Sequence, residues 1–309
     1  MNAIIKTYQN ESLAITSIGL DGELIDNVTS LPKPRIYVYE DMIVATAAEC
    51  LDVTEAEYEV LLETDVRSAL GDIKIVRIIK AGNCLVGGPS TILSMERIIK
   101  ILKTFKVDKI LIDGAFSRKT ISKTSDACIF AVGAVKSPDM DQVISAAKLT
   151  IRQFALPKIT AEFEHLEAYE TITLIDHEGG EQVLSIDSVL SDPEVIFGLI
   201  DETTRFIYLP GALSQQFAKE YIRRRRTSLP DIILKSPTHL VLPENIMGQL
   251  FQAGIRIFVI NPINLIGVAY NPFSPTGYVF DEIQFRQRLI EITSLPIINV
   301  MNESEEVHE

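Results

Sequence analysis

From residue 73 onward, the sequence alternates short apolar runs with segments of helical periodicity, separated by glycines and prolines. The runs at 107–112 and 127–133 are continuously apolar, as strands of a sheet that is buried on both faces must be. In 90–105 and 139–154 the apolar residues recur every three or four positions, which indicates helices that cover such a sheet. Strands that alternate with helices predict an α/β protein with doubly wound, mainly parallel sheets.

The alternation of strand and helix patterns is less regular between about residues 158 and 200. It returns afterwards with a strand, a helix and a further strand. We therefore expect two doubly wound, mainly parallel α/β units, at 73–157 and at 158–300. The last nine residues, 301–309, are predicted to form a disordered acidic tail.

The first 72 residues have a different pattern, with apolar residues that alternate in the manner of strands. Asp21-Gly22 separates two such runs and predicts a hairpin. Segment 1–72 is expected to be a small β-rich element packed on the first unit. Within it, the acidic stretch after Thr54 is predicted to begin a helix, with Thr54 as its N-cap.

Composition excludes several functional classes. The chain has 309 residues and a formal net charge of −13, whereas a nucleic-acid-binding protein needs a basic surface. No apolar run approaches the roughly 20 residues that span a bilayer, and the start of the chain turns polar too early for a secretory signal. We expect a cytoplasmic protein that binds neither nucleic acid nor membrane.

The basic cluster 223–226 fits a helix C-terminus, and the alternative is a docking patch for an acidic partner.

The glycine-rich segment 82–90 resembles a phosphate-binding loop but lacks its essential residues. Gly82 and Gly87 have the required separation, yet Gly88 and Pro89 stand where lysine and a hydroxyl residue should follow. What remains is a turn before a helix, with Ser90 or Thr91 as the cap. Two interpretations stay open: an anion site at the helix N-terminus, and a tight turn that lets strand and helix pack closely.

A second candidate site begins at Asp113, which follows an apolar strand. A carboxylate at this position can hold Mg²⁺, or it can cap the turn that Gly114 continues. The hydroxyl-rich loop that follows either binds an anion or is simply solvated; its candidate ligands are Arg118, Lys119 and Ser122. Asp126 begins the next strand and is expected to pair with Arg118 or to join the site. The histidines and cysteines show no metal-ligand spacing, so only Asp113 is a candidate metal ligand.

These two segments are expected to lie side by side. Sequential parallel strands usually neighbour one another, and their carboxyl ends form one edge of the sheet. Gly87 and Gly88 should therefore face Asp113 across a cleft suited to phosphate or a Mg-nucleotide. A third segment, 261–281, has two Asn-Pro steps and is interpreted as a loop whose prolines fix a binding surface.

Three sequence stretches, "GNCLVGGPS", "ILIDGAFSRKTISKTSDACIFAVGA" and "NPFSPTGYVFD", carry a family resemblance. They resemble the accessory proteins encoded beside adenosylcobalamin-dependent lysine 5,6-aminomutase in bacterial lysine fermentation, over about residues 35 to 300. Val132 stands where that family usually has threonine. The residues that match the family pattern are Asp113, Gly114, Ala115, Arg118, Ser122, Asp126, Gly133 and Ala134.

The resemblance implies an accessory subunit without catalytic residues that helps to reactivate the aminomutase. It implies two partners, the aminomutase and an ATPase subunit that would carry the ATP site, with cobalamin reached only through a partner. A homo-oligomer is also compatible with the sequence. The alternative is a nucleotide- or anion-binding enzyme or switch that uses Asp113 with the Gly87-Gly88 turn.

Overall fold

The computed structural model describes residues 1–18, 35–114, 125–191, 193–224 and 229–301. The protein is 32% helical and 31% strand and has an α/β fold with mainly parallel sheets, which confirms the predicted class. It forms two compact units, residues 1–124 and 125–309. The hairpin predicted at Asp21-Gly22 and nearly all of the predicted acidic tail lie outside the described residues.

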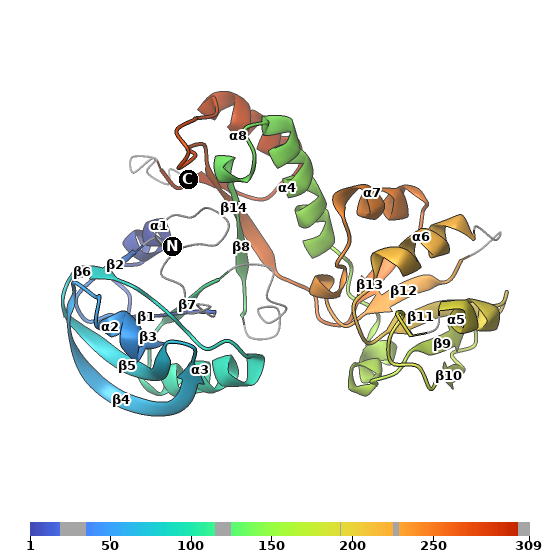
Figure 1. Cartoon of the computed structure of the whole chain (residues 1–309), viewed down its shortest axis with the longest axis horizontal. Coiled ribbons are helices and arrows are strands. Elements are labelled where there is room, and N and C mark those ends of the chain that lie inside the picture. The colour runs from blue at the N-terminus through green and yellow to red at the C-terminus, as the bar shows by residue number, and fades with distance from the viewer. Residues whose placement is uncertain (19–34, 115–124, 192, 225–228, 302–309) are drawn as a thin grey trace. The chain divides into compact units, whose positions relative to one another are not determined.

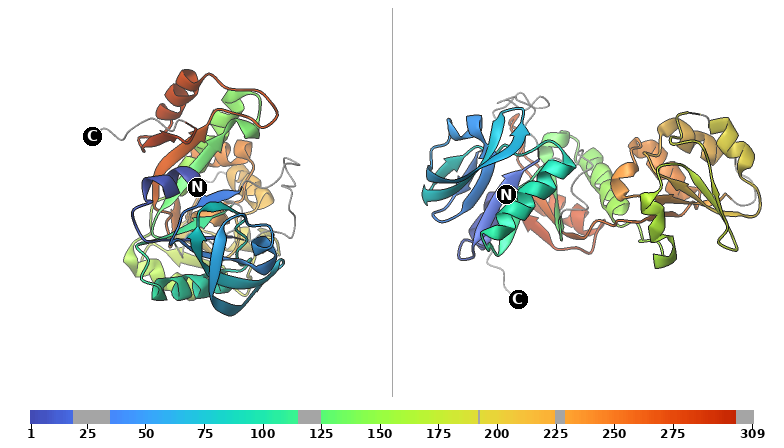
Figure 2. Two further views of the ribbon diagram at one scale, coloured as in Figure 1. Left: turned by 90° about the vertical axis from the view of Figure 1, so that its left-hand side faces the viewer. Right: turned by 90° about the horizontal axis from the view of Figure 1, so that it is seen from below.

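The first unit is built on a five-stranded sheet with strand order β4-β5-β3-β1-β7. Its elements are α1 (Asn2–Thr7), β1 (Leu13–Ser17), β2 (Ile36–Val38), β3 (Ile43–Ala47), α2 (Ala48–Leu51), β4 (Glu57–Ser68), β5 (Gly71–Lys80), β6 (Gly82–Cys84), α3 (Ile92–Thr104) and β7 (Lys109–Asp113) (Figure 1). β1 runs parallel to both β3 and β7. α3 packs on one face of the sheet through Ile98 and Leu102, and Figure 2 shows the helix lying beside the strands.

The second unit contains two sheets, with strand orders β10-β9-β11-β12-β13 and β15-β14-β8. Its strands are β8 (Cys128–Gly133), β9 (Thr173–Asp176), β10 (Glu181–Val183), β11 (Thr204–Leu209), β12 (Asp231–Leu234), β13 (Ile257–Val259), β14 (Leu265–Asn271) and β15 (Ile297–Asn299). Its helices are α4 (Met140–Phe154), α5 (Pro193–Leu199), α6 (Gln215–Arg223), α7 (Glu244–Gln252) and α8 (Glu282–Ile290), with 3₁₀ turns η2 (Ala134–Lys136), η3 (Ala161–Ala168) and η4 (Pro237–His239).

Helices and turns cover the sheets of the second unit. α5, α6 and α7 pack on one face of the five-stranded sheet, and η3 packs on the other. α4 and α8 share a core with the three-stranded sheet. The end of α4 is tied to η4, because the Gln153 amide donates to the Pro237 and Leu240 carbonyls at 2.6 and 3.0 Å.

The division into units differs from the expected boundaries at 72 and 157. β1 lies between β3 and β7 inside the first sheet, so the amino-terminal residues belong to the first unit and form no separate element. β8 pairs with β14, far along the chain, and this pairing places residues 125–157 in the second unit. The predicted apolar strands do form, but their partners depend on contacts that sequence order does not reveal.

Three local predictions are wrong. The helix expected after Thr54 is the strand β4, which pairs antiparallel with β5 from Glu57 to Ser68. Glu57, Glu59 and Glu63 also form cross-strand ion pairs with basic residues of β5. Residues 3–8, whose apolar residues alternate in the manner of a strand, lie mainly in the helix α1. The segment 261–281 is not wholly a loop, because it contains β14, the central strand of the three-stranded sheet.

Candidate functional site

The glycine-rich segment crosses the carboxyl edge of the first sheet, where β1, β3 and β7 all end. Thr46, which is fully buried on β3, accepts a hydrogen bond from the Gly87 N–H at 2.9 Å and donates to the Leu85 carbonyl at 3.2 Å. The Gly87 carbonyl accepts from the Ala47 N–H at 2.8 Å. The backbone of this segment is therefore bonded to β3.

Gly88 lies directly against β1. Its N–H donates to Ser17 Oγ at 3.3 Å, and a Cβ atom at Gly88 would lie 1.7 Å from the Ser17 carbonyl oxygen. Only glycine permits so close an approach. The N–H groups of Gly87 and Gly88 are both engaged inside the protein, so a phosphate would have to displace Thr46 and Ser17 to use them.

Asp113 lies on the side of Ser17 that faces away from Gly88, on the neighbouring strand β7. The two residues are register partners in the parallel pair of β1 and β7, and the Ile18 N–H donates to the Asp113 carbonyl at 2.7 Å. Ser17 thus lies between Gly88 and Asp113, and the structure brings these two predicted segments together. Asp113 and Gly114 are exposed, whereas Arg118, Lys119 and Ser122 lie outside the described residues.

Ser90 and Thr91 are exposed at the start of α3. Thr91 is the N-cap of this helix, because its hydroxyl oxygen accepts from the Ser94 N–H at 3.3 Å. This confirms one of the two predicted caps. The role is structural, since it satisfies an N–H group that the helix itself leaves unpaired.

Asp126 does not belong to the unit that contains Gly88 and Asp113. It lies in the second unit, with its side chain exposed, and its carbonyl accepts a hydrogen bond from the Asn264 amide at 2.9 Å. Asn264 in turn accepts from the Cys128 N–H at 2.8 Å. These contacts tie the start of β8 to the start of β14, a structural role that the sequence order concealed.

The structure also joins two segments that sequence analysis treated separately. Gly133, at the end of β8, is the register partner of Asn271, at the end of β14. The Tyr278 hydroxyl donates to the Ala134 carbonyl. The strand end "VGA" and the turn "NPFSPTGYVFD", which both carry the family resemblance, therefore form one feature at the carboxyl edge of the three-stranded sheet.

Backbone hydrogen bonds fix the turn in that feature. The Phe273 N–H donates to the Asn271 side chain at 2.9 Å, and the Ser274 N–H donates to the Tyr278 carbonyl at 2.9 Å. The Phe280 N–H donates to the Pro272 carbonyl at 2.9 Å, and Gly277 adopts a φ of 98°. The turn has the fixed geometry that its prolines predicted, although β14 precedes it.

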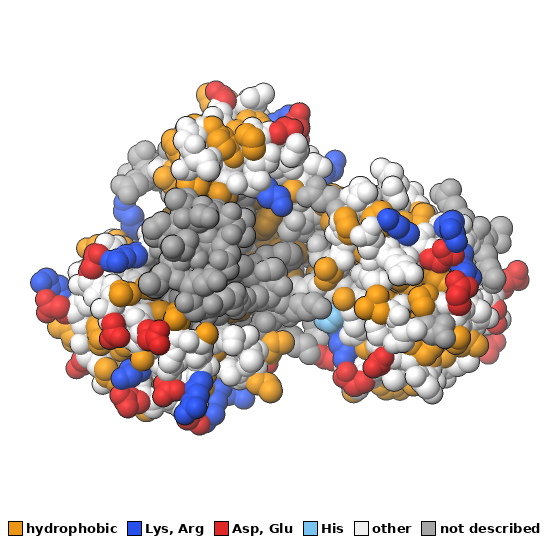
Figure 3. All heavy atoms as spheres, viewed as in Figure 1, with side chains coloured by type: hydrophobic (Ala, Val, Ile, Leu, Met, Phe, Trp, Pro, Cys, Tyr) orange, Lys and Arg blue, Asp and Glu red, His pale blue; other side chains and the backbone are white. Residues whose placement is uncertain are grey.

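Exposed apolar side chains surround this turn. We call them the apolar rim: each large hydrophobic residue in it is between 36 and 71% exposed. Its members are Val135, Phe273, Val279, Ile283, Val300 and Met301. In the view of Figure 3, hydrophobic side chains gather on the surface over α8.

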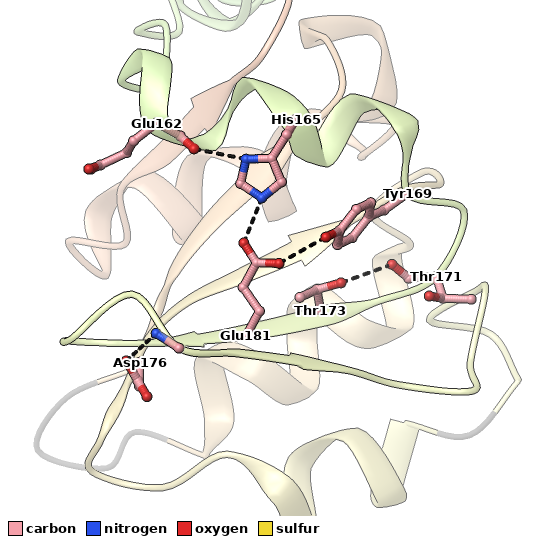
Figure 4. A network of polar contacts seen from close by, with 8 residues as sticks. Glu162, His165, Tyr169, Thr171, Thr173, Asp176 and Glu181 are labelled. Carbon is pink, nitrogen blue, oxygen red and sulfur yellow. Dashed lines mark hydrogen bonds and ion pairs between the residues drawn. The ribbon is translucent and has the colours of Figure 1, made fainter.

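A polar network that sequence analysis missed lies elsewhere in the second unit (Figure 4). One carboxylate oxygen of Glu181 on β10 contacts His165 Nε2 at 2.6 Å, and the other accepts from the Tyr169 hydroxyl at 3.1 Å. The bond to Glu181 raises the pKa of Tyr169. Both oxygens of the carboxylate have partners, so the network fastens η3 to the edge of the sheet rather than presenting a catalytic acid.

A shallow polar hollow beside Glu181 is lined by Asp176 and Asp201. Asp201 accepts from the side chain and the N–H of Thr203, at 2.6 and 2.9 Å, and these bonds hold its pKa below the ordinary value. Asp176 accepts from the Gly180 N–H at 2.7 Å. Both carboxylates stabilise turns, and the described part of the chain contains no cluster of three or more His, Cys, Asp or Glu side chains that could hold a metal ion.

The basic cluster at the end of α6 is partly neutralised. Arg224 pairs with Glu220 at 2.6 Å and with Glu194 at 2.5 Å, and Arg223 pairs with Glu220 at 2.8 Å. Arg225 and Arg226 lie outside the described residues. For the two described arginines these contacts agree with the helix-terminus interpretation and leave less charge for an acidic partner.

Comparisons of the chain with protein-family models, curated proteins and solved structures returned no match. Among the helices of the described residues, none has the length and apolar character needed to cross a membrane.

Proposed function

We propose that this chain is a non-catalytic accessory protein that helps to reactivate a cobalamin-dependent aminomutase together with an ATPase subunit. The observation that carries the proposal is the joining of the strand end at Gly133-Ala134 to the turn that contains Tyr278. Two of the stretches that resemble the accessory family thereby build one fixed, exposed surface. Such a surface suits contact with another protein better than acid–base chemistry, because its exposed members are apolar.

The hydrogen bonds of the glycine-rich segment favour the same function. An anion site needs N–H groups that point at the ligand, and those of Gly87 and Gly88 donate to Thr46 and Ser17. The lysine of a phosphate-binding loop is also absent. In this proposal ATP binds to the partner, and cobalamin is reached through the aminomutase.

A second function, binding of a Mg-nucleotide by the chain itself, is favoured by one observation. Asp113 is exposed at the carboxyl edge of the first sheet, next to the strand on which Gly88 packs. Calorimetry with ATP or GTP and Mg²⁺ separates the two functions. The accessory function predicts no binding by the chain alone, whereas micromolar binding that Asp113→Ala abolishes would establish the nucleotide-binding function.

Association of the purified proteins tests the accessory function directly. Lysine 5,6-aminomutase, the ATPase subunit and this chain are mixed in pairs and all together, with and without ATP, and analysed by sedimentation velocity. We expect this chain to sediment with the aminomutase, the ATPase or both. If it sediments alone in every mixture, the accessory function is wrong.

A further inference from the structure

We infer that the contact between η3 and β10 is a pH-sensitive clamp, which is closed while His165 carries a positive charge and loosens when this residue loses its proton. The clamp consists of His165, Tyr169, Glu181 and the Glu162 carbonyl (Figure 4). It belongs to the five-stranded sheet and shares no residue with the apolar rim, so it does not depend on the proposed function.

Both ring nitrogens of His165 face oxygen atoms that accept hydrogen bonds. Nδ1 is 2.8 Å from the Glu162 carbonyl oxygen, and Nε2 is 2.6 Å from a carboxylate oxygen of Glu181. A neutral imidazole has one N–H donor and one bare nitrogen, whereas the imidazolium cation has two donors. A neutral His165 would therefore point a lone pair at one of the two oxygens, so the observed contacts require the cation.

Glu181 does not supply the second proton. Its other carboxylate oxygen accepts from the Tyr169 hydroxyl at 3.1 Å, and carboxyl groups ordinarily ionise near about pH 4, below the range in which histidine titrates. The bond to Glu181 also raises the pKa of Tyr169, so this hydroxyl keeps its proton and remains a donor. Of the side-chain types in the clamp, histidine is the one that changes charge between about pH 5 and 8.

His165 provides the counter-charge of Glu181. β10 is an exposed edge strand, but the Glu181 side chain is only 21% exposed, and that of His165 is 46% exposed. Within the described part of the chain, no Lys or Arg forms an ion pair with Glu181. A largely buried carboxylate without a counter-charge is unfavourable. Deprotonation of His165 would therefore remove a hydrogen bond and this counter-charge together.

The other acidic groups on the elements of the clamp have partners of their own. They are Glu162, Glu164 and Glu167 on η3 and Asp176 on β9, which contact Thr160, Lys158, Asn261 and Gly180 in that order. Carboxyl groups are ordinarily ionised throughout the range in which histidine titrates. His177 and Glu178 lie on the turn between β9 and β10, with their side chains exposed. His177 is therefore the residue against which the role of His165 is tested.

The effect of the clamp is local and has a definite sign. β10 is the outer strand and pairs only with β9 in the described sheet, and edge elements of this kind open most readily. Phe163 and Leu166 keep η3 packed on the sheet through buried apolar contacts that do not titrate. The charge on His165 adds to the stability of β10 at low pH, and this contribution is lost as the pH rises. The edge of the sheet should therefore loosen at alkaline pH while its centre stays folded.

Hydrogen–deuterium exchange of the complete chain tests the clamp. It is measured by mass spectrometry at about pH 5.5 and about pH 8.5, on either side of the range in which histidine titrates, with exchange times scaled for the intrinsic rate at each pH. Peptides that cover β10 are compared with peptides that cover β12, which is inside the same sheet. His165→Gln removes the titrating group, and Glu181→Gln removes the charge that it pairs with. His177→Gln is the matched control.

We expect the protection of β10 in the wild type to be about two- to fivefold greater at the lower pH, the size of one partly exposed ion pair, with β12 unchanged. His165→Gln and Glu181→Gln should abolish this difference, and His177→Gln should keep it. No difference in the wild type, a difference of the opposite sign, or one that survives in His165→Gln would overturn the clamp. If the exchange of β12 shows that His165→Gln does not fold, the comparison of Glu181→Gln with His177→Gln decides in its place.

Discussion

Gly88 is the residue whose substitution the structure constrains most narrowly. Gly88→Ala would place a methyl group 1.7 Å from the Ser17 carbonyl oxygen, so the glycine-rich segment would have to leave β1. Overpacking in a core typically costs about 1–3 kcal/mol, and we expect a loss near the upper end of that range in urea unfolding.

The matched control for Gly88→Ala is Gly248→Ala. Gly248 lies inside α7, and an added Cβ atom there would meet no atom within 4 Å. Because alanine is the better helix former, this variant should gain about 0.5–1 kcal/mol. A Gly88→Ala protein as stable as the wild type would contradict the close packing of Gly88 on β1.

The ion pair of Glu220 with Arg224 predicts a pH-dependent contribution to stability. The hydrogen bond from Arg224 holds the pKa of Glu220 below its ordinary value. A group whose pKa is lower in the folded state stabilises the protein above the unfolded-state pKa of about 4.3 and loses this effect as the pH falls through the folded-state value. The difference in Tm between wild type and Glu220→Gln should therefore be larger at pH 6 than at pH 3. A difference that is independent of pH would refute the assigned cause.

At the scale of elements, the Thr46 hydroxyl bonds the glycine-rich segment to β3. Thr46→Val keeps the shape of the side chain but leaves the Gly87 N–H and the Leu85 carbonyl without their partner. Leaving a buried polar group unpaired costs about 1–3 kcal/mol, so we expect a loss of about 2–4 kcal/mol in urea unfolding. Thr46→Ser keeps the hydroxyl and should lose less. Equal losses for the two variants would mean that the hydroxyl does not hold the segment.

Elements whose formation depends on local pattern were predictable from the sequence. The helices α3 and α4 and the strands β7 and β8 form where periodicity placed them. The acidic residues of β4 also suit a helix start, so the sequence predicts a helix there; the antiparallel pairing with β5 depends on the fold and makes the segment a strand.

The candidate site, like the secondary structure, was predictable only where it depends on local pattern. The nearness of Gly88 and Asp113 follows from parallel strands that end at one edge, but the strand that separates them is β1, from the start of the chain. Asp126 begins β8, whose partner is β14, a pairing that sequence order does not reveal; its expected ion pair with Arg118 stays a prediction, because Arg118 lies outside the described residues. The apolar rim could not be predicted for the same reason, since its residues lie on α8 and on segments that follow three strands paired only in the fold.

At the scale of the whole molecule, the motifs that carry the family resemblance divide between two compact units. Gly88 and Asp113 belong to residues 1–124, and the rim belongs to residues 125–309. In the first unit, the glycine-rich segment packs against the backbone at the carboxyl edge of the sheet. In the second unit, exposed apolar residues lie at the carboxyl edge of the three-stranded sheet. We interpret this division of features as that of the proposed accessory protein, which would bind its partner and leave the nucleotide to the ATPase subunit.

Recovery of enzyme activity tests that claim most directly. Inactivated lysine 5,6-aminomutase is incubated with fresh adenosylcobalamin, ATP and the ATPase subunit, and its activity is followed with and without this chain. We expect that activity returns substantially only when the chain is present. Equal recovery with and without the chain would contradict the proposed accessory function.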